Sequence, residues 1–261
     1  VCLDAEGKHL WRYQTGGQNR AVTSADLDGD GTPEVLLGSD DEHVYVLNAA
    51  GEEQKRFHCD FPLRVGTSSV RDPRVGNIAV GDMDGDGMPE IVACMLNGNL
   101  VQFSRDFEVQ WRYDRIPHGS RELALIDLDR DGRLEVLVAN KYGAVQVFDS
   151  TGKSRPGVYS ELGDVEMAIG NMDEDQDYEI ANGSATGTFN VGQWGGETEF
   201  SFHNYGFAVR ELIMADVAGT APDELLVASE TGYAYVLGAG GEAVAQLDFG
   251  EVVTDLVLLP R

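Results

Sequence analysis

Cysteine is scarce in this sequence, and so is positive charge. The 261 residues include three cysteines, Cys2, Cys59 and Cys94, and 19 lysines and arginines against 45 aspartates and glutamates. An odd, widely spaced set of cysteines excludes a disulfide framework and allows one pair at most. A formal charge of -26 repels phosphate backbones, so we expect no nucleic-acid partner.

Long apolar runs and familiar catalytic motifs are also missing. No stretch of the sequence is apolar for long enough to span a bilayer, so membrane insertion is not expected. The sequence contains no GxSxG, no HExxH and no GxxxxGK[ST] phrase. No convincing helical periodicity is present either, which favours an all-β chain.

An acidic phrase is repeated along the chain. It reads DLDGDGTPE from Asp26, DMDGDGMPE from Asp82, DLDRDGRLE from Asp127, NMDEDQDYE from Asn171 and DVAGTAPDE from Asp216. Successive starts are 56, 45, 44 and 45 residues apart. A nearly fixed period of this size is typical of a solenoid, a propeller or another repeat array.

Each repeat contains four short runs of strand-forming residues. One run precedes the acidic phrase and three follow it, separated by Gly, Asn and Asp. Four antiparallel strands in about 45 residues is the size of one propeller blade. The alternative is a β-solenoid, whose repeats are usually shorter.

We therefore predict a single β-propeller domain over residues 1–261, with about six blades of four antiparallel strands. The blades are expected to start near residues 21, 77, 122, 166, 211 and 252. The run from Val252 resembles a first strand, and residues 1–15 resemble a third and a fourth strand. Both termini would thus complete the last blade, which either closes with three strands or belongs to a longer parent chain. Trp11 and Trp111 fall on expected fourth strands, where they would pack between blades.

The acidic phrases predict calcium sites. Calcium prefers several oxygen ligands, and alternate carboxylates around a turn glycine allow a short loop to surround it. The expected ligands, including a backbone carbonyl at the seventh position, are Asp26, Asp28, Asp30, Thr32 and Glu34; Asp82, Asp84, Asp86, Met88 and Glu90; and Asp127, Asp129, Asp131, Arg133 and Glu135. An EF-hand is the competing motif, but it needs flanking helices and a longer loop.

The last two phrases depart from the pattern. Asn171, Asp173, Asp175 and Glu179 fit it, whereas Gln176 replaces the turn glycine and Asp177 adds a carboxylate. We expect this fourth loop to bind calcium, more weakly. The fifth carries Ala218 and Thr220 at acidic positions, so we expect no ion there. Three or four structural Ca²⁺ ions are predicted in all, and removing them should destabilise the protein.

These DxDxDGxxE repeats resemble the FG-GAP/VCBS family, which includes integrin α-subunit propellers and many bacterial secreted proteins. The phrase GKHLWRYQTGG from Gly7 is also similar to blades of quinoprotein-like propellers, although no quinone-binding set accompanies it. The resemblance implies an extracellular calcium-bearing propeller that binds a protein or a glycan. It does not imply one activity.

Arginines recur at one position of the repeat, six residues before the first metal ligand. Arg20, Arg121 and Arg210 occupy it, and Arg74 lies nearby in the second repeat. On the face opposite the calcium loops they could bind acidic groups of a ligand, with help from His118 and Tyr205. Alternatively, each arginine pairs with a local acid such as Glu122 or Glu211 and ties blades together.

The leading hypothesis is a non-catalytic binding propeller for carbohydrate, including acidic polysaccharide, within a larger secreted or cell-surface protein. A signal peptide is not part of this chain. The alternatives are a polysaccharide lyase, with an arginine neutralising a uronate and a histidine or tyrosine as base, and an integrin-like protein-interaction propeller. A closed ring exposes few strand edges, so we expect a monomer.

Overall fold

A computed structural model of the chain describes residues 1–65, 68–70, 72–116, 119–140, 144–159, 165–173, 175–184, 186–219 and 221–258. Over these residues the regular structure consists of strands alone, numbered β1 to β24. No helix in this part of the chain is long and apolar enough to cross a membrane.

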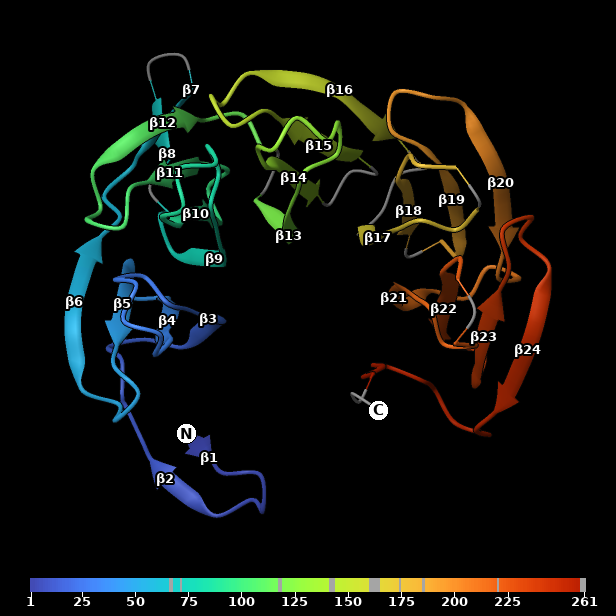
Figure 1. Cartoon of the computed structure of the whole chain (residues 1–261), viewed down its shortest axis with the longest axis horizontal. Helices are drawn as coiled ribbons and strands as arrows, with labels where there is room; N and C mark the ends of the chain where they lie inside the picture. Colours follow the sequence, from blue (N-terminus) through green and yellow to red (C-terminus); the bar gives the residue numbers. More distant parts are fainter. Residues whose placement is uncertain are drawn as a thin grey trace. The chain divides into compact units, whose positions relative to one another are not determined.

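The strands form four-stranded antiparallel sheets in which chain order equals spatial order (Figure 1). The described part of the chain contains five such sheets. They consist of β3 (Asn19–Ala25), β4 (Glu34–Ser39), β5 (His43–Leu47) and β6 (Glu53–His58); β9 (Val75–Gly81), β10 (Glu90–Met95), β11 (Leu100–Phe103) and β12 (Val109–Tyr113); β13 (Ser120–Ile126), β14 (Glu135–Asn140), β15 (Ala144–Phe148) and β16 (Ser154–Tyr159); β17 (Val165–Gly170), β18 (Glu179–Ser184), β19 (Thr188–Gln193) and β20 (Thr198–His203); and β21 (Val209–Ala215), β22 (Glu224–Ser229), β23 (Tyr233–Leu237) and β24 (Ala243–Asp248).

Two smaller sheets complete the described strands. β1 (Cys2–Leu3) pairs with β2 (His9–Trp11), and β7 (Leu63–Val65) pairs with β8 (Ser68–Val70). The β1–β2 pair matches the expected third and fourth strands at the start of the chain. Residues 252–258 are described without a strand, so the completion of a last blade by both termini stays a prediction.

The chain divides into two compact units, Val1–Val136 with Phe148–Lys153, and Leu137–Val147 with Ser154–Arg261. Within the first unit, the first strands of successive sheets are neighbours, β3 with β9 and β9 with β13. Within the second unit, β17 and β21 are neighbours in the same way. This is the arrangement of propeller blades, in which each sheet packs face to face on the next.

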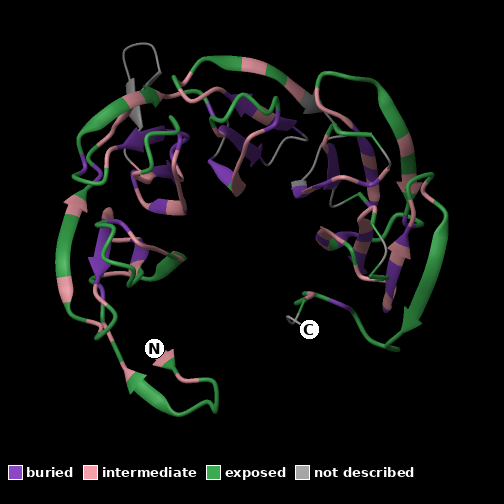
Figure 2. Ribbon diagram, viewed as in Figure 1, coloured by how far each residue is buried: buried purple, intermediate pink, exposed green. Residues whose placement is uncertain are grey.

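Each unit has its own apolar core between its sheets. In the first, β4, β5, β10 and β11 contribute buried aliphatic residues, and the Phe57 and Phe107 rings stack with centroids 5.2 Å apart. In the second, Phe189, Leu225 and Val227 are fully buried. In each four-stranded sheet, the second and third strands are mostly buried and the fourth strand is mostly exposed (Figure 2).

Trp11 on β2 and Trp111 on β12 each contact the turn that joins the last two strands of the following sheet. The indole Nε1 of Trp11 donates to the carbonyl of Ala49 at 2.9 Å, and that of Trp111 donates to Ser150 at 3.0 Å. Gly51 has a φ of 79°, and a Cβ placed there would lie 2.4 Å from the Trp11 ring. Trp11 and Trp111 are thus packing residues, as the sequence indicated.

Candidate metal sites in the acidic loops

Every acidic phrase forms the loop between the first and second strands of a four-stranded sheet. We call these loops 1 to 5, spanning residues 26–34, 82–90, 127–135, 171–179 and 216–224, and number the positions within each from one to nine. Because every loop connects equivalent strands, equivalent positions can be compared directly.

In loops 1, 2, 3 and 5 an aspartate at position one accepts backbone N–H groups, whereas in loop 4 the amide of Asn171 donates to the carbonyl of Asp175 at 2.8 Å. Asp26 accepts from Gly29 at 2.7 Å and from Gly31 at 2.8 Å, and Asp82 makes the matching bonds with Gly85 and Gly87, both at 2.8 Å. Gly31 and Gly87 each have a φ of 87°, in the left-handed region that glycine adopts without strain.

The carboxylate at position five holds the following turn. Its Oδ1 accepts the N–H of position seven at 2.7 Å in loop 1, 2.8 Å in loop 2, 2.9 Å in loop 3 and 2.8 Å in loop 4. The position-seven residues Thr32, Met88, Arg133 and Asp177 are therefore part of the same turn. The role of their carbonyl or carboxylate groups as metal ligands stays a prediction.

The glutamate at position nine reaches back across the loop. Its Oε2 accepts the N–H of position two, at 3.0 Å for Glu34, 2.9 Å for Glu90 and Glu135, and 2.5 Å for Glu179. This bond fixes one oxygen of each glutamate and sets the direction of the other.

The apolar residue at position two anchors loops 1 to 4. Leu27, Met83, Leu128 and Met172 are each at most 6% exposed, although each has an acidic residue directly after it. The sequence interpretation assigned them no role. The signal was present as one large aliphatic residue at the second position of every phrase, and its burial ties the loop to the core between sheets.

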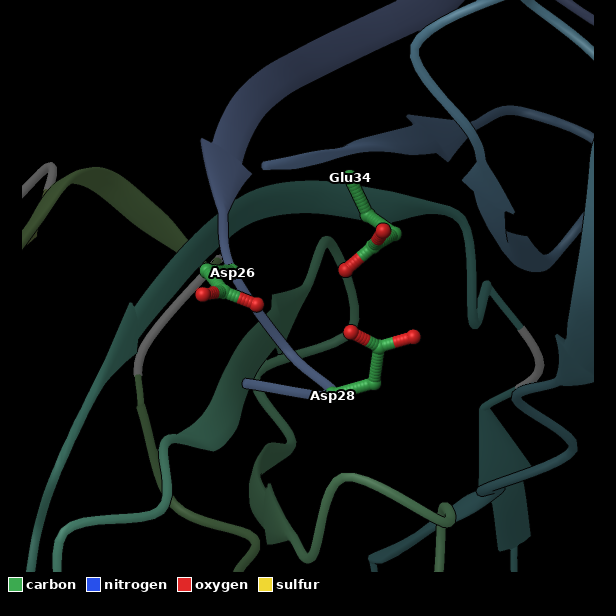
Figure 3. A group of neighbouring side chains, drawn as sticks. All are labelled: Asp26, Asp28 and Glu34. Carbon is green, nitrogen blue, oxygen red and sulfur yellow. The ribbon is translucent and has the colours of Figure 1, made fainter. Parts of the chain in front are cut away.

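The carboxylates of loops 1 to 3 converge. In loop 1, Asp26, Asp28 and Glu34 turn their oxygens toward a common centre (Figure 3). The other two groups are Asp82, Asp84 and Asp86, and Asp127, Asp129 and Glu135. Within each group, one oxygen from each residue lies within 4.8 Å of the others. An all-oxygen donor set of this kind fits a hard divalent cation such as calcium.

The electrostatics of the clusters favour a bound cation. Burial raises the pKa of Glu90 and of Glu135, and the aspartates of the same loop raise it further. Glu135 is only 2% exposed. A buried carboxylate surrounded by negative charge is unfavourable without a neutralising partner, and a cation would supply one.

Loop 4 gathers a different set of residues. Asp173 and Glu179 are joined by Glu199 of β20, and one oxygen from each lies within 4.8 Å of the others. Burial, with help from Asp173 and Glu199, raises the pKa of Glu179 to about 7. Glu179 is fully buried, and its Oε1 has no hydrogen-bond partner. Glu199 was missed by the sequence interpretation because it lies outside the repeated phrase.

Loop 5 keeps the bonds made by positions one and nine and has fewer acids. Asp216 accepts the N–H of Gly219 at 2.6 Å, and Glu224 accepts from Val217 at 3.0 Å. Ala218 has no ligand atom to offer at position three. Our expectation that this loop binds no ion stays a prediction.

The recurring arginines have acidic neighbours. Arg20 and Arg210 pair with Asp40 and Glu230, each twenty residues farther along, and Arg74 donates two bonds to Asp72, at 2.6 and 2.9 Å. Arg74 also approaches Asp40 to 3.9 Å, so Arg20 and Arg74 meet at one carboxylate. Each of these three arginines is therefore paired with an acid, and a role for them in binding a ligand stays a prediction.

The remaining candidate ligand-binding residues are Arg121, Tyr205 and His118. Arg121 lies on β13, where its carbonyl accepts a bond from the Asn77 side chain at 3.3 Å. Tyr205 is 85% exposed at the turn after β20. His118 lies outside the described residues.

All three cysteines are free, and two of them are deeply buried. Burial raises the pKa of the Cys59 thiol to about 12 and that of Cys94 to about 11. Both therefore behave as small apolar core residues.

The comparisons with known proteins agree with the repeat and with the fold. Residues 26–93 match the model of the FG-GAP-like repeat, which confirms the FG-GAP/VCBS resemblance. No curated protein sequence matches the chain.

Among solved structures, the crystal structure of BBS1N in complex with ARL6DN, soaked with lead, aligns with a TM-score of 0.69 and 14% identity, covering 91% of this chain and 72% of that one. The mercury-soaked crystal aligns with a TM-score of 0.62 and 14% identity, covering 91% and 84%. The predicted β-propeller fold is confirmed by this likeness to the BBS1 propeller.

Proposed function

We propose that this chain, with its FG-GAP-like repeats, is a calcium-stabilised, non-catalytic propeller that binds a protein partner. The observation that carries the proposal is the repeated convergence of carboxylates in loops 1 to 4 on turns that the backbone holds in place. Clustered acids of this kind are costly in a stable protein unless a cation is bound.

Calcium would neutralise the clusters and join the first two strands of each sheet at one end. Asp26, Asp28 and Glu34 would hold the ion in loop 1, Asp82, Asp84 and Asp86 in loop 2, and Asp127, Asp129 and Glu135 in loop 3. The ion would supply charge neutralisation and cross-linking of the loop. We assign it no part in a reaction.

A protein partner is supported by the fold and by the exposed surface. The BBS1N propeller of the similar structure was crystallised in complex with ARL6DN. In the present chain, Tyr205 and Phe207 are 85% and 49% exposed on a single turn. Exposed aromatic side chains are common anchors of protein interfaces.

A calcium-dependent capture experiment tests this function. Immobilised chain, with calcium or with chelator, would be compared with Tyr205→Asp and with Leu247→Asp, a control at another exposed apolar position. We expect the original chain to capture a protein partner in calcium and to lose it in chelator. In calcium, Tyr205→Asp should fail to capture this partner, whereas Leu247→Asp should retain it. Equal capture by all forms would contradict the assigned surface.

Carbohydrate binding in a secreted or cell-surface setting is the second candidate, because an exposed aromatic ring such as Tyr205 also suits a sugar face. A glycan array of neutral and acidic polysaccharides would measure it on the same variants. Retention of one glycan class that Tyr205→Asp abolishes, without protein capture, would favour this candidate. New unsaturated-product absorbance on uronate polymers would instead indicate a lyase.

A further inference from the structure

Loop 4 is completed by a residue from another strand. Glu199 lies on β20, the fourth strand of the same sheet, twenty residues after Glu179. One of its carboxylate oxygens lies within 4.8 Å of oxygens of Asp173 and Glu179. In the other three clusters, every residue comes from within the nine-residue loop itself.

A β-bulge places Glu199 beside the loop. Gly192 pairs with Thr198 and Val191 pairs with Phe200, which leaves Glu199 as the extra residue between them. The same irregularity in three other sheets falls on Gln54, Gln110 and Val244. Among the four-stranded sheets whose last pair of strands has a described register, Glu199 is the sole carboxylate at this position. Bulges commonly redirect a side chain toward a functional site.

The neighbouring Asp175 is occupied by other bonds. Its Oδ2 accepts the side-chain amide of Gln193 at 2.6 Å, and its Oδ1 accepts the N–H of Asp177 at 2.8 Å. Position five of loop 4 therefore has a donor on each oxygen. In loops 1 and 3 the cluster consists of positions one, three and nine, and because loop 4 has Asn171 at position one, Glu199 brings the third carboxylate in place of that position.

An unpaired oxygen at the centre of the group points to a ligand. Glu179 is fully buried, its Oε2 accepts the Met172 N–H, and its Oε1 has no partner. Burying a carboxylate oxygen without a hydrogen-bond donor or a cation costs more free energy than losing a contact at the surface. Because two more carboxylates face it, a divalent cation satisfies this oxygen, whereas another hydrogen-bond acceptor cannot.

We propose that Glu199 is a direct ligand of a calcium ion in loop 4, together with Asp173 and Glu179. This inference rests on the proposed binding of calcium by the acidic loops. It replaces the expectation from sequence that loop 4 is a weakened copy of loops 1 to 3. The fourth site is a distinct type, built from a loop and a strand.

Hydrogen exchange followed by mass spectrometry during a calcium titration tests the assignment. The full-length chain is titrated with calcium alone, and protection is followed separately in peptides that cover residues 26–34 and 171–179. Glu199→Gln removes the proposed ligand, and Glu197→Gln is the matched control with the same charge change two residues earlier. Thermal unfolding in chelator checks that both variants are folded.

In Glu199→Gln, the calcium midpoint of loop 4 is expected to rise by about tenfold or more, because calcium affinity follows the number of charged ligands. The midpoint of loop 1 should not change. Glu197→Gln should leave both midpoints within about twofold of the original chain. In chelator, Glu199→Gln should be at least as stable as the original, since it loses a repulsive charge.

Two results would overturn the inference, and they differ. If loop 1 responds to calcium while the loop 4 midpoint is the same in the original chain and in Glu199→Gln, the role of Glu199 is wrong and the proposed function stands. If no loop gains protection at any calcium concentration, the calcium proposal and this inference both fail.

Discussion

Loops 1 and 5 share two bonds between an acidic side chain and the backbone, and they differ in charge. Each has an aspartate at position one that accepts the N–H of position four, at 2.7 Å in loop 1 and 2.6 Å in loop 5. Each has a glutamate at position nine that accepts the N–H of position two, at 3.0 Å in both. Between them, loop 1 carries Asp28 where loop 5 carries Ala218.

The comparison shows which acids the turn needs. Loop 5 keeps the bonds of positions one and nine without a carboxylate at position three, so these two bonds do not need one. Asp28 adds negative charge near Asp26 and Glu34, which by itself opposes folding. The additional acids of loops 1 to 3 are therefore best explained by a bound cation.

Removing calcium should have the largest effect and should separate the two kinds of loop. At a calcium concentration one hundred times the dissociation constant, each site contributes about 2.7 kcal/mol to the free energy of unfolding. Chelator should therefore lower the melting temperature by more than about 10 °C. Hydrogen exchange should increase in loops 1 to 4 and change little in loop 5. An unchanged melting temperature would contradict the account.

The pH dependence of stability should reverse with calcium. The pKa of Glu179 is raised to about 7 in the folded protein, mainly by burial. Without calcium, the folded state keeps this proton to a higher pH than the unfolded chain does. The free energy of unfolding should therefore fall as the pH rises from about 4.5 to 7, by up to about 3 kcal/mol.

With calcium present, deprotonated carboxylates are required for binding, so stability should instead rise over the same pH interval. Urea unfolding at several pH values, with and without calcium, measures both trends. Parallel curves in the two conditions would show that these carboxylates do not bind the ion.

Removing the charge at position nine should weaken calcium binding when it is done in loop 3 and should have no effect on calcium binding when it is done in loop 5. Glu135→Gln and Glu224→Gln both keep a side-chain oxygen that can accept the backbone N–H. The loop 3 midpoint in a calcium titration should rise by about tenfold in Glu135→Gln. Glu224→Gln should shift no midpoint by more than about twofold. Similar shifts in the two variants would remove the distinction between the loops.

The smallest expected effect is that of a substitution at position three, which should change the stability in opposite directions with and without calcium. Asp28→Asn should destabilise the protein by about 1 kcal/mol in calcium, because the ion loses a charged ligand. In chelator the same substitution should stabilise the protein by a similar amount, because one repulsive charge is gone. Chemical denaturation in both conditions gives the two values, and destabilisation in both would argue for a purely structural aspartate.

The repeated sequence pattern was sufficient to predict most of the strands and their order in each sheet. The acidic phrases fall between the first and second strands of successive sheets, as their spacing predicted, because a strand–turn–strand unit is encoded locally. The residues between the first two phrases include an additional hairpin, β7–β8, which accounts for a spacing of 56 residues where the others are 44 or 45.

The sequence was less informative about contacts between distant segments. Glu199 lies outside the repeated phrase, and its approach to Glu179 depends on a bulge that no local pattern predicts. Likewise, the pairing of Arg20 with Asp40 rather than with a sequence neighbour follows from the register of β3 on β4. Such contacts are set by sheet geometry, which the amino-acid order specifies only through the whole fold.

The number of bound calcium ions and their positions decide whether loops 1 to 4 are metal sites. Native mass spectrometry of the full chain would give the number of bound ions, and anomalous diffraction from calcium-soaked crystals would give their positions. The account predicts four ions, one each in loops 1 to 4, with Glu199 on the fourth and none in loop 5. A chain without calcium in loops 1 to 3, or with an ion in loop 5, would contradict it.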